Sequence, residues 1–335
     1  MHRIAVNELL TMRRVLSFRA IREEEVAAML WAVASIGDGG AVVDMHARLS
    51  RDVFLRELER SIGLVAGFNP ADVCRSSRLA AWASGAVHCT KECRDTVFGI
   101  LDGIIAEHQE RVGAGAGDAE DTEGRWPPVS TRHGLHQSSH LVMRRATMEV
   151  RRAFEAGGKV VEQQLGELVP YLHLVIRETL QLHTPPLLLP RECREEPACR
   201  VLGYDVPKGT QVLVNAWALG RDERYWPDKP EEFRPERFEP AGDGKDGAAV
   251  EVDFKGVDFE FLPFGAGRRM CPGMAFGLAN VELALASLLL HFDWEAPGPN
   301  GSLDMTEAFG ITARRKAGLL LRPIMRLPVP DNLTS

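Results

Sequence analysis

The sequence lacks a long uncharged hydrophobic run. A membrane-spanning helix needs about 20 predominantly apolar residues, and the nearest approach, residues 274–292, contains Asn280 and Glu282. We therefore expect a buried helix there. Residues 1–21 contain four arginines but no apolar stretch ahead of a small-residue cleavage site, so they do not form a secretory signal.

Excess positive charge and abundant cysteine are also absent. Lys and Arg number 40 against 47 Asp and Glu, and the resulting net charge of −7 argues against a general nucleic-acid binder. Six cysteines in 335 residues exclude a disulfide-dense scaffold, and without a signal we expect them to be reduced. Cys89 and Cys93 stand at helical spacing, but no second cysteine pair completes a zinc site.

The length and composition suit a soluble globular protein of one large domain or two ordinary ones. Apolar residues recur at helical spacing in 23–33, 54–64 and 97–105, which predicts helices in the first third of the chain. Residues 112–139 are rich in Gly, Ser, Pro and charge, and we interpret them as a polar linker.

The remaining chain predicts helices over 140–154 and 162–183, the second ended by Pro185 and Pro186. β-branched residues on either side of a Pro-Lys-Gly turn predict a hairpin over 200–215. Residues 220–260 read as irregular. We expect a last strong helix over 272–291 and strands within 311–327.

The segment from Phe264 to Gly273 carries the clearest chemistry. Arg268 and Arg269 precede Cys271, and nearby cations and a following helix start both favour the thiolate form that ligates a metal. Pro272 is suited to the first helical position. Gly267 and Gly273 let the backbone turn tightly beside a flat ligand, and Phe264 supplies an aromatic wall.

This segment resembles the cysteine loop of the cytochrome P450 family, Phe-x-x-Gly-x-Arg-x-Cys-x-Gly, at all five fixed positions. They are Phe264, Gly267, Arg269, Cys271 and Gly273. The resemblance implies that Cys271 is the axial thiolate of a haem iron and that Arg269 pairs with a haem propionate. Thiolate ligation favours cleavage of the O–O bond. The style of the loop resembles plant microsomal members.

A second match lies upstream, where residues 235–238 read Pro-Glu-Arg-Phe. The resemblance implies that Arg237 docks onto a Glu-x-x-Arg pair of the helix before Pro185. Glu178 matches that pair, but Gln181 stands in place of the arginine. Glutamine lacks the guanidinium fork that contacts a carboxylate at two points, so we expect a lock of two members in place of three.

Two further positions resemble haem-binding arginines of the family. Arg191, in Leu-Pro-Arg-Glu, resembles a second propionate-binding arginine. Residues 1–10 resemble the middle of the family's third helix, after its tryptophan, where His2 or Arg3 is the remaining basic candidate. We take Arg3 as a candidate cofactor-binding residue.

The oxygen side of the haem departs from the family pattern. The long central helix with its Ala-Gly-x-Asp/Glu-Thr kink should fall between about 109 and 140, where this sequence has only the polar linker. Residues 116–122 imitate the motif with two extra residues and no flanking apolar helix. We therefore identify no catalytic residue on the oxygen side.

Three histidines in the polar segment, His133, His136 and His140, offer an alternative metal site. They lie in a polar stretch without a clear fourth ligand, so a solvated cluster is favoured over a zinc protein.

The expected fold is mainly α with a small β portion, a single P450-like domain that is incomplete. Its parts are an N-terminal helical part (1–111), the linker (112–139) and a haem-thiolate core (140–330). The resemblance implies a monooxygenase that binds haem and iron and acts on an apolar small molecule with O2. Its electrons would come from NADPH through a reductase. The alternative is an inactive, truncated relative that binds haem weakly or not at all.

The family's plant members are anchored to the endoplasmic reticulum by an N-terminal helix. We find no such anchor in this sequence, so we expect a soluble chain or one held at a membrane surface.

Overall fold

The computed structural model describes residues 11–37, 41–45, 137–194, 196, 198–227, 229–239, 252–297, 303–304, 306–308 and 314–330. The expected helical stripes at 54–64 and 97–105, the sequence 116–122 and residues His2, Arg3, His133 and His136 lie outside these ranges. His140 lies in a described helix, but its side chain is outside the description. Over the described residues the protein is mainly helical with small antiparallel sheets, which confirms the expected fold class.

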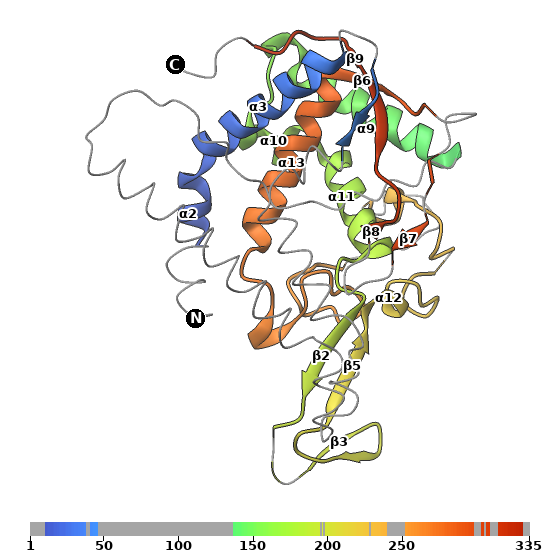
Figure 1. Cartoon of the computed structure of the whole chain (residues 1–335). Coiled ribbons are helices and arrows are strands. Elements are labelled where there is room, and N and C mark those ends of the chain that lie inside the picture. The colour runs from blue at the N-terminus through green and yellow to red at the C-terminus, as the bar shows by residue number, and fades with distance from the viewer. Residues whose placement is uncertain are drawn as a thin grey trace, which may run out of the picture.

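The helical body is built around α13 (Met274–His291), which packs against α3 (Arg19–Gly37), α9 (Gln137–Phe154), α10 (Glu162–Leu168) and α11 (Pro170–Leu182) (Figure 1). The short α2 (Met12–Ser17) is capped by the Thr11 side chain and also contacts α13. Leu283, Ala286, Leu289 and Leu290 of α13 are buried in the largest apolar cluster. In the described part of the chain, only α13 is long and apolar enough to cross a membrane. A buried core helix of a soluble protein can have the same length and composition.

The chain between residues 162 and 182 forms two helices, so the prediction of one helix over 162–183 was wrong. Pro170 has no N–H to donate, and a residue before proline is disfavoured in the helical region. Val169 accordingly takes φ −128° and ψ 56° and ends α10 by donating to the Leu165 carbonyl. The carboxylate of Glu149 accepts from the backbone N–H groups of Tyr171 and Leu172 at 2.9 and 3.0 Å. This contact fixes the start of α11.

The predicted hairpin over 200–215 was also wrong in its pairing. β3 (Cys199–Val201) pairs with β4 (Tyr204–Val206), and the turn between them is Leu202-Gly203, at φ 50° and 87°. Two central residues of positive φ match the twist of a tight hairpin. β5 (Gln211–Asn215) pairs instead with β2 (Leu188–Glu192), with Arg191 opposite Val212. Strands β2, β3 and β5 extend away from the helices (Figure 1).

The other described strands form two further sheets. β9 (Leu320–Met325) pairs with β6 (Phe292–Glu295) and β1 (Val43–Asp44), and β7 (Glu307–Ala308) pairs with β8 (Arg314–Arg315). The strands expected within 311–327 are thus confirmed. Short helices fill the rest of the described chain: η2 (Glu155–Gly157), α12 (Ala216–Leu219), η3 (Pro235–Phe238) and η4 (Gly267–Arg269).

Two helix starts differ from expectation by a few residues. α9 begins at Gln137, three residues inside the segment we interpreted as linker. α13 begins at Met274, so Pro272 lies before the helix and Gly273 is its N-terminal capping position. Pro272 therefore does not start the helix.

Candidate functional site

The loop that carries Cys271 is a series of tight turns between a buried segment and α13. Gly265 and Gly267 take φ of 72° and 66°, a region that L side chains rarely adopt. The Cys271 N–H donates to the Phe264 carbonyl at 2.8 Å, which closes the loop on itself. Phe261 and Leu262 are buried, whereas Cys271 is exposed and its thiol is free. The folded loop therefore presents a thiol outward from a rigid base.

Arginines from two distant parts of the chain share this face. Arg268 and Arg269 lie in η4 and are exposed. Arg191, on β2, brings its guanidinium beside the loop, since a Cβ placed on Gly265 would lie 3.9 Å from Arg191 Nη2. Within the described ranges none of the three has a carboxylate partner, and Arg191 Nη1 donates only to the Pro190 carbonyl at 2.9 Å. Among the described residues, the face therefore carries three guanidinium groups without a carboxylate partner.

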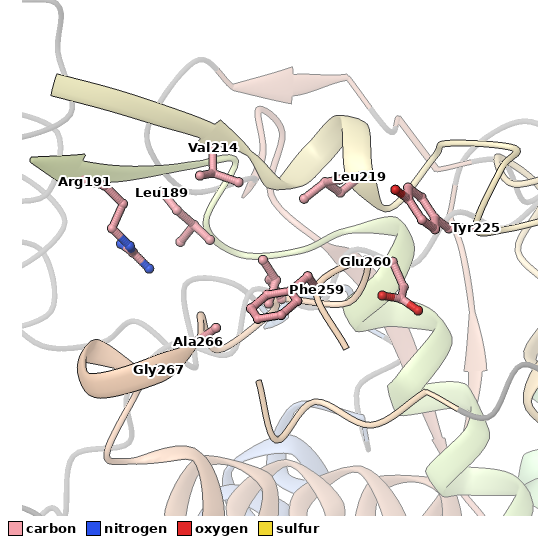
Figure 2. Close-up of a pocket in the computed structure, with 10 residues that line it drawn as sticks. Leu189, Arg191, Val214, Leu219, Tyr225, Phe259, Glu260, Ala266 and Gly267 are labelled. Carbon is pink, nitrogen blue, oxygen red and sulfur yellow. The ribbon is translucent and has the colours of Figure 1, made fainter. Parts of the chain in front are cut away.

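An apolar cavity of about 410 Å³ lies between β2, β5 and the start of the loop. Figure 2 shows Arg191 and Leu189 on β2, with Ala266 and Gly267 of the loop opposite them and Glu260 and Tyr225 at the far end. The other lining residues are Val214, Leu219, Phe259 and Leu262. The cavity beside the loop is thus lined mostly by apolar side chains, with the Arg191 guanidinium at one end.

The second predicted group, Glu178, Gln181 and Arg237, forms a buried assembly that we call the α11–η3 lock. Arg237 Nε donates to Glu178 Oε2 at 2.9 Å, and the side chains are 2% and 0% exposed. The other carboxylate oxygen accepts from the Arg234 backbone N–H at 2.7 Å. Arg237 Nη2 donates to the Glu232 and Lys229 carbonyls at 2.8 and 3.2 Å. The predicted pairing of Glu178 with Arg237 is therefore present in the structure.

Burial raises the pKa of the Glu178 carboxyl above its ordinary value, while Arg237 and the Arg234 N–H act to lower it. The carboxylate thus depends on these partners to remain ionised in a buried site. One carboxylate oxygen of Glu178 accepts from Arg237 of η3, and the other accepts from Arg234, the residue before η3. Glu178 therefore connects α11 to η3.

Gln181 occupies the third position of the lock without touching the ion pair in any contact that the structure shows. Its Nε2 donates to the carbonyls of Gly220 and Pro230, and its Oε1 is buried without a partner among the described residues. Arg237 Nη1 is likewise buried and has no partner in the part of the chain that the structure describes. The Gln181 amide therefore joins α11 to the segment that follows α12. The sequence analysis did not predict this contact, because it considered only the arginine that Gln181 replaces.

A chain of aromatic rings, which our sequence analysis missed, connects the lock to the cysteine loop. Phe238 of η3 and Phe261 pack on Trp226 with ring centroids 5.8 and 5.7 Å away. Phe254 then contacts both Phe261 and Phe264, at 6.1 and 5.7 Å. The rings sit in irregular backbone, where no periodicity marks them as buried. This packing transmits the position of α11 and η3 to the loop of Cys271.

The donor set and the free space around it fit a haem. A thiolate is the ligand, and guanidinium groups are the partners that carboxylates of a flat macrocycle require. A Cβ added to Gly267 or to Gly277 of α13 would meet no atom within 4 Å, so there is open space beside the loop and beside the first turns of α13. Residues 274–279, the apolar first turns of α13, are only half-buried. Together these features are compatible with a haem-thiolate type of site.

Comparison with known proteins gives the family. The family model described as Cytochrome P450 matches residues 139–321. Zealexin A1 synthase of Zea mays is 38% identical to this chain over 98% of it and 74% of its own length. Cytochrome P450 71D10 of Glycine max is 35% identical over 98% and 73%, and Dolabradiene monooxygenase of Zea mays is 38% identical over 97% and 73%. The chain belongs to the cytochrome P450 family.

By this family resemblance the protein is a haem-thiolate monooxygenase, an oxidoreductase of the kind found in plant secondary metabolism. Family membership implies haem as cofactor, a redox partner and a small-molecule substrate. Plant members of the family are generally proteins of the endoplasmic-reticulum membrane. The relatives named above include a monooxygenase, and nothing in the comparisons supports the alternative of an inactive relative.

The match to the first maize protein extends over 384 residues, whereas this chain has 335. At least 49 of the matched positions therefore have no counterpart here (384 − 335). The family model begins to match at residue 139, the last residue of the polar segment.

The zinc alternative has no support within the described ranges, where no group of three or more His, Cys, Asp or Glu residues is placed to hold a metal ion. His133 and His136 lie outside those ranges, so that prediction stays untested.

Proposed function

We propose that this protein inserts one oxygen atom of O2 into an apolar small molecule, with Cys271 as the axial ligand of its haem. The observation that carries the proposal is the free, exposed Cys271 thiol on a loop that also carries Arg268 and Arg269 and that lies beside the Arg191 guanidinium of β2. Among the described residues these three arginines have no carboxylate partner. Electrons come from NADPH through a reductase.

Each residue at the face has a separate task. Cys271 binds the iron through its sulfur. Arg269 and Arg191 hold the two propionates by charge-assisted hydrogen bonds. Phe264 shields the sulfur side, and Gly267 and Gly273 allow close approach of the backbone. When bound, the haem supplies the activation of dioxygen.

The α11–η3 lock and the aromatic chain hold this face in place. The loop is not supported by a regular ladder, so its geometry depends on Phe264 and Phe261 being packed against Phe254, Trp226 and Phe238. The lock anchors the other end of that chain to α11. We assign Glu178, Gln181 and Arg237 this positioning role.

One spectrum tests the haem assignment. The purified chain loaded with haem, reduced and exposed to carbon monoxide, should show the strongly red-shifted Soret band of a thiolate-ligated iron. A band at the ordinary position, with histidine-like ligation, would contradict the role of Cys271. Turnover is tested separately by NADPH consumption with a reductase and a panel of apolar substrates. If the thiolate band is present but no substrate raises NADPH consumption, the protein binds haem but the monooxygenase proposal is refuted.

A further inference from the structure

Two other cysteines, Cys193 and Cys199, meet at the base of the β3–β4 hairpin, on the opposite side of Arg191 from the helical body. Their Sγ atoms are 3.2 Å apart. Cys193 is buried at 9% exposure, and Cys199 is partly exposed. Both sulfurs also lie near the Val206 carbonyl oxygen, at 3.3 and 3.8 Å.

Backbone hydrogen bonds hold both residues in place. Cys193 extends the β2–β5 ladder by one step, since its N–H donates to Thr210 and its carbonyl accepts from Gly209 at 2.9 and 2.7 Å. Cys199 is the first residue of β3 and lies opposite Val206 of β4. The two thiols are thus brought together by two different strand pairs and not by a flexible loop.

We propose that Cys193 and Cys199 are a reversible redox pair that closes to an intramolecular disulfide. A disulfide needs the sulfurs at about 2.05 Å, and a pair already in contact reaches that separation by small side-chain adjustments. The bond ties the β3–β4 hairpin to the end of β2, two residues beyond Arg191.

The oxidant in this proposal is a low-molecular-weight disulfide such as oxidised glutathione. The thiolate of Cys199, the more accessible residue, attacks one sulfur and releases one glutathione thiolate, which takes up the proton lost by Cys199. The thiolate of Cys193 then attacks the Cys199 sulfur of the mixed disulfide and expels the second glutathione in the same way. Two electrons pass from the protein thiols to the small disulfide, so one disulfide is formed and one is broken.

The sequence allows a direct test on the full, unmodified chain, because Arg194 lies between the two cysteines. The protein is equilibrated with oxidised glutathione, alkylated, and digested with trypsin without reduction. We expect the peptide Glu192–Arg194 to be joined to the peptide 195–200, with the mass of the sum less two hydrogens. Dithiothreitol before alkylation should separate them, with one alkyl group on each.

Alkylation of both thiols after oxidation, or a joined peptide that contains another cysteine, would overturn the proposal. The variant Cys193→Ser provides the control, because it removes the resolving thiol and should leave glutathione attached to Cys199. Failure of this adduct to accumulate would contradict the order of attack. The result does not depend on haem binding, so this experiment tests the redox pair independently of the proposed function.

Discussion

The α11–η3 lock and the cysteine loop both carry arginines of the family pattern, but the fold treats the two sets of charges in opposite ways. In the lock, Arg237 is 2% exposed and is neutralised by Glu178 within the chain. At the loop, Arg191 and Arg269 are exposed, and within the described part of the chain they have no carboxylate partner. A charge that the fold satisfies serves stability, whereas one that the fold leaves open is available for a ligand.

The sharpest way to break this comparison is to remove the thiol. Cys271→Ala leaves the lock untouched and removes the proposed iron ligand. We therefore expect complete loss of the red-shifted carbon monoxide band, with no loss of thermal stability in the haem-free chain. Absorbance and circular dichroism measure the two effects. Cys199→Ser is the matched control and should retain the band; a surviving band in Cys271→Ala would refute the assignment.

The next largest effect is expected inside the lock. Glu178→Gln keeps the shape of the side chain but leaves Arg237 buried without its counter-charge, and such breaks cost about 3–5 kcal/mol. Urea denaturation of the purified protein measures the change. The control is Asp205→Asn, which breaks the exposed pair with Arg200 (side chains 75% and 77% exposed) and should cost under about 1 kcal/mol. Equal losses in the two variants would show that the lock is not special.

The open arginines should affect binding more than folding. Arg191→Ala and Arg269→Ala each remove a charge-assisted hydrogen bond, worth about 1.5–3 kcal/mol, so haem should bind about 10- to 100-fold more weakly. Titration with haem followed by absorbance gives the affinities. Arg200→Ala, on the neighbouring strand β3, should bind haem as the unchanged protein does. If the arginine variants lose folding stability and keep haem affinity, Arg191 and Arg269 serve stability and not ligand binding.

Gln181 tests how much the third position of the lock contributes. Gln181→Ala leaves the buried carbonyls of Gly220 and Pro230 without a donor, which should cost about 1–3 kcal/mol. Gln181→Glu should cost at least as much, because an ionised carboxylate cannot donate to either carbonyl. Both are measured by denaturation. A glutamate variant as stable as the unchanged protein would contradict the donor role.

The smallest expected effect is a pH dependence between α11 and α13. The hydrogen bond to Glu282, at 3.2 Å, raises the pKa of His173, and burial acts in the opposite direction. Because the folded pKa is raised, this contribution is full below the unfolded value of about 6.5 and is lost as pH rises through the folded pKa. We expect about 1 kcal/mol or less.

Denaturation of His173→Gln at a series of pH values measures that contribution by difference from the unchanged protein. Glu149 and the contact of the ring with the Leu165 carbonyl also raise the His173 pKa, so the difference reports these two contacts together with the hydrogen bond to Glu282. The difference should shrink as pH rises. A difference that grows with pH would show the opposite sign.

Whether a structural feature could be predicted from the sequence depends on how close together its residues lie in the chain. The cysteine loop could be predicted because Phe264, Arg269 and Cys271 are close neighbours along the chain. The break at Pro170 was missed although its cause is local, because the helical periodicity continues across it. The strand pairing was missed because an apolar residue, Leu202, takes the positive φ of the β3–β4 turn. The Pro-Lys-Gly sequence does form a turn, in which the Thr210 N–H donates to the Pro207 carbonyl at 3.1 Å, but that turn leads from β4 to β5, and these strands pair with β3 and β2.

The sequence by itself determined which residues make up the proposed haem-binding set, since a thiol, two arginines and their glycines are a matter of residue type and spacing. Only the tertiary structure decided which charges are satisfied and which are open. It placed Arg191 beside Gly265, turned Gln181 towards backbone carbonyls, and joined the lock to the loop through five aromatic rings. The physical reason is that burial and pairing depend on contacts between residues far apart in the chain, which no local pattern records.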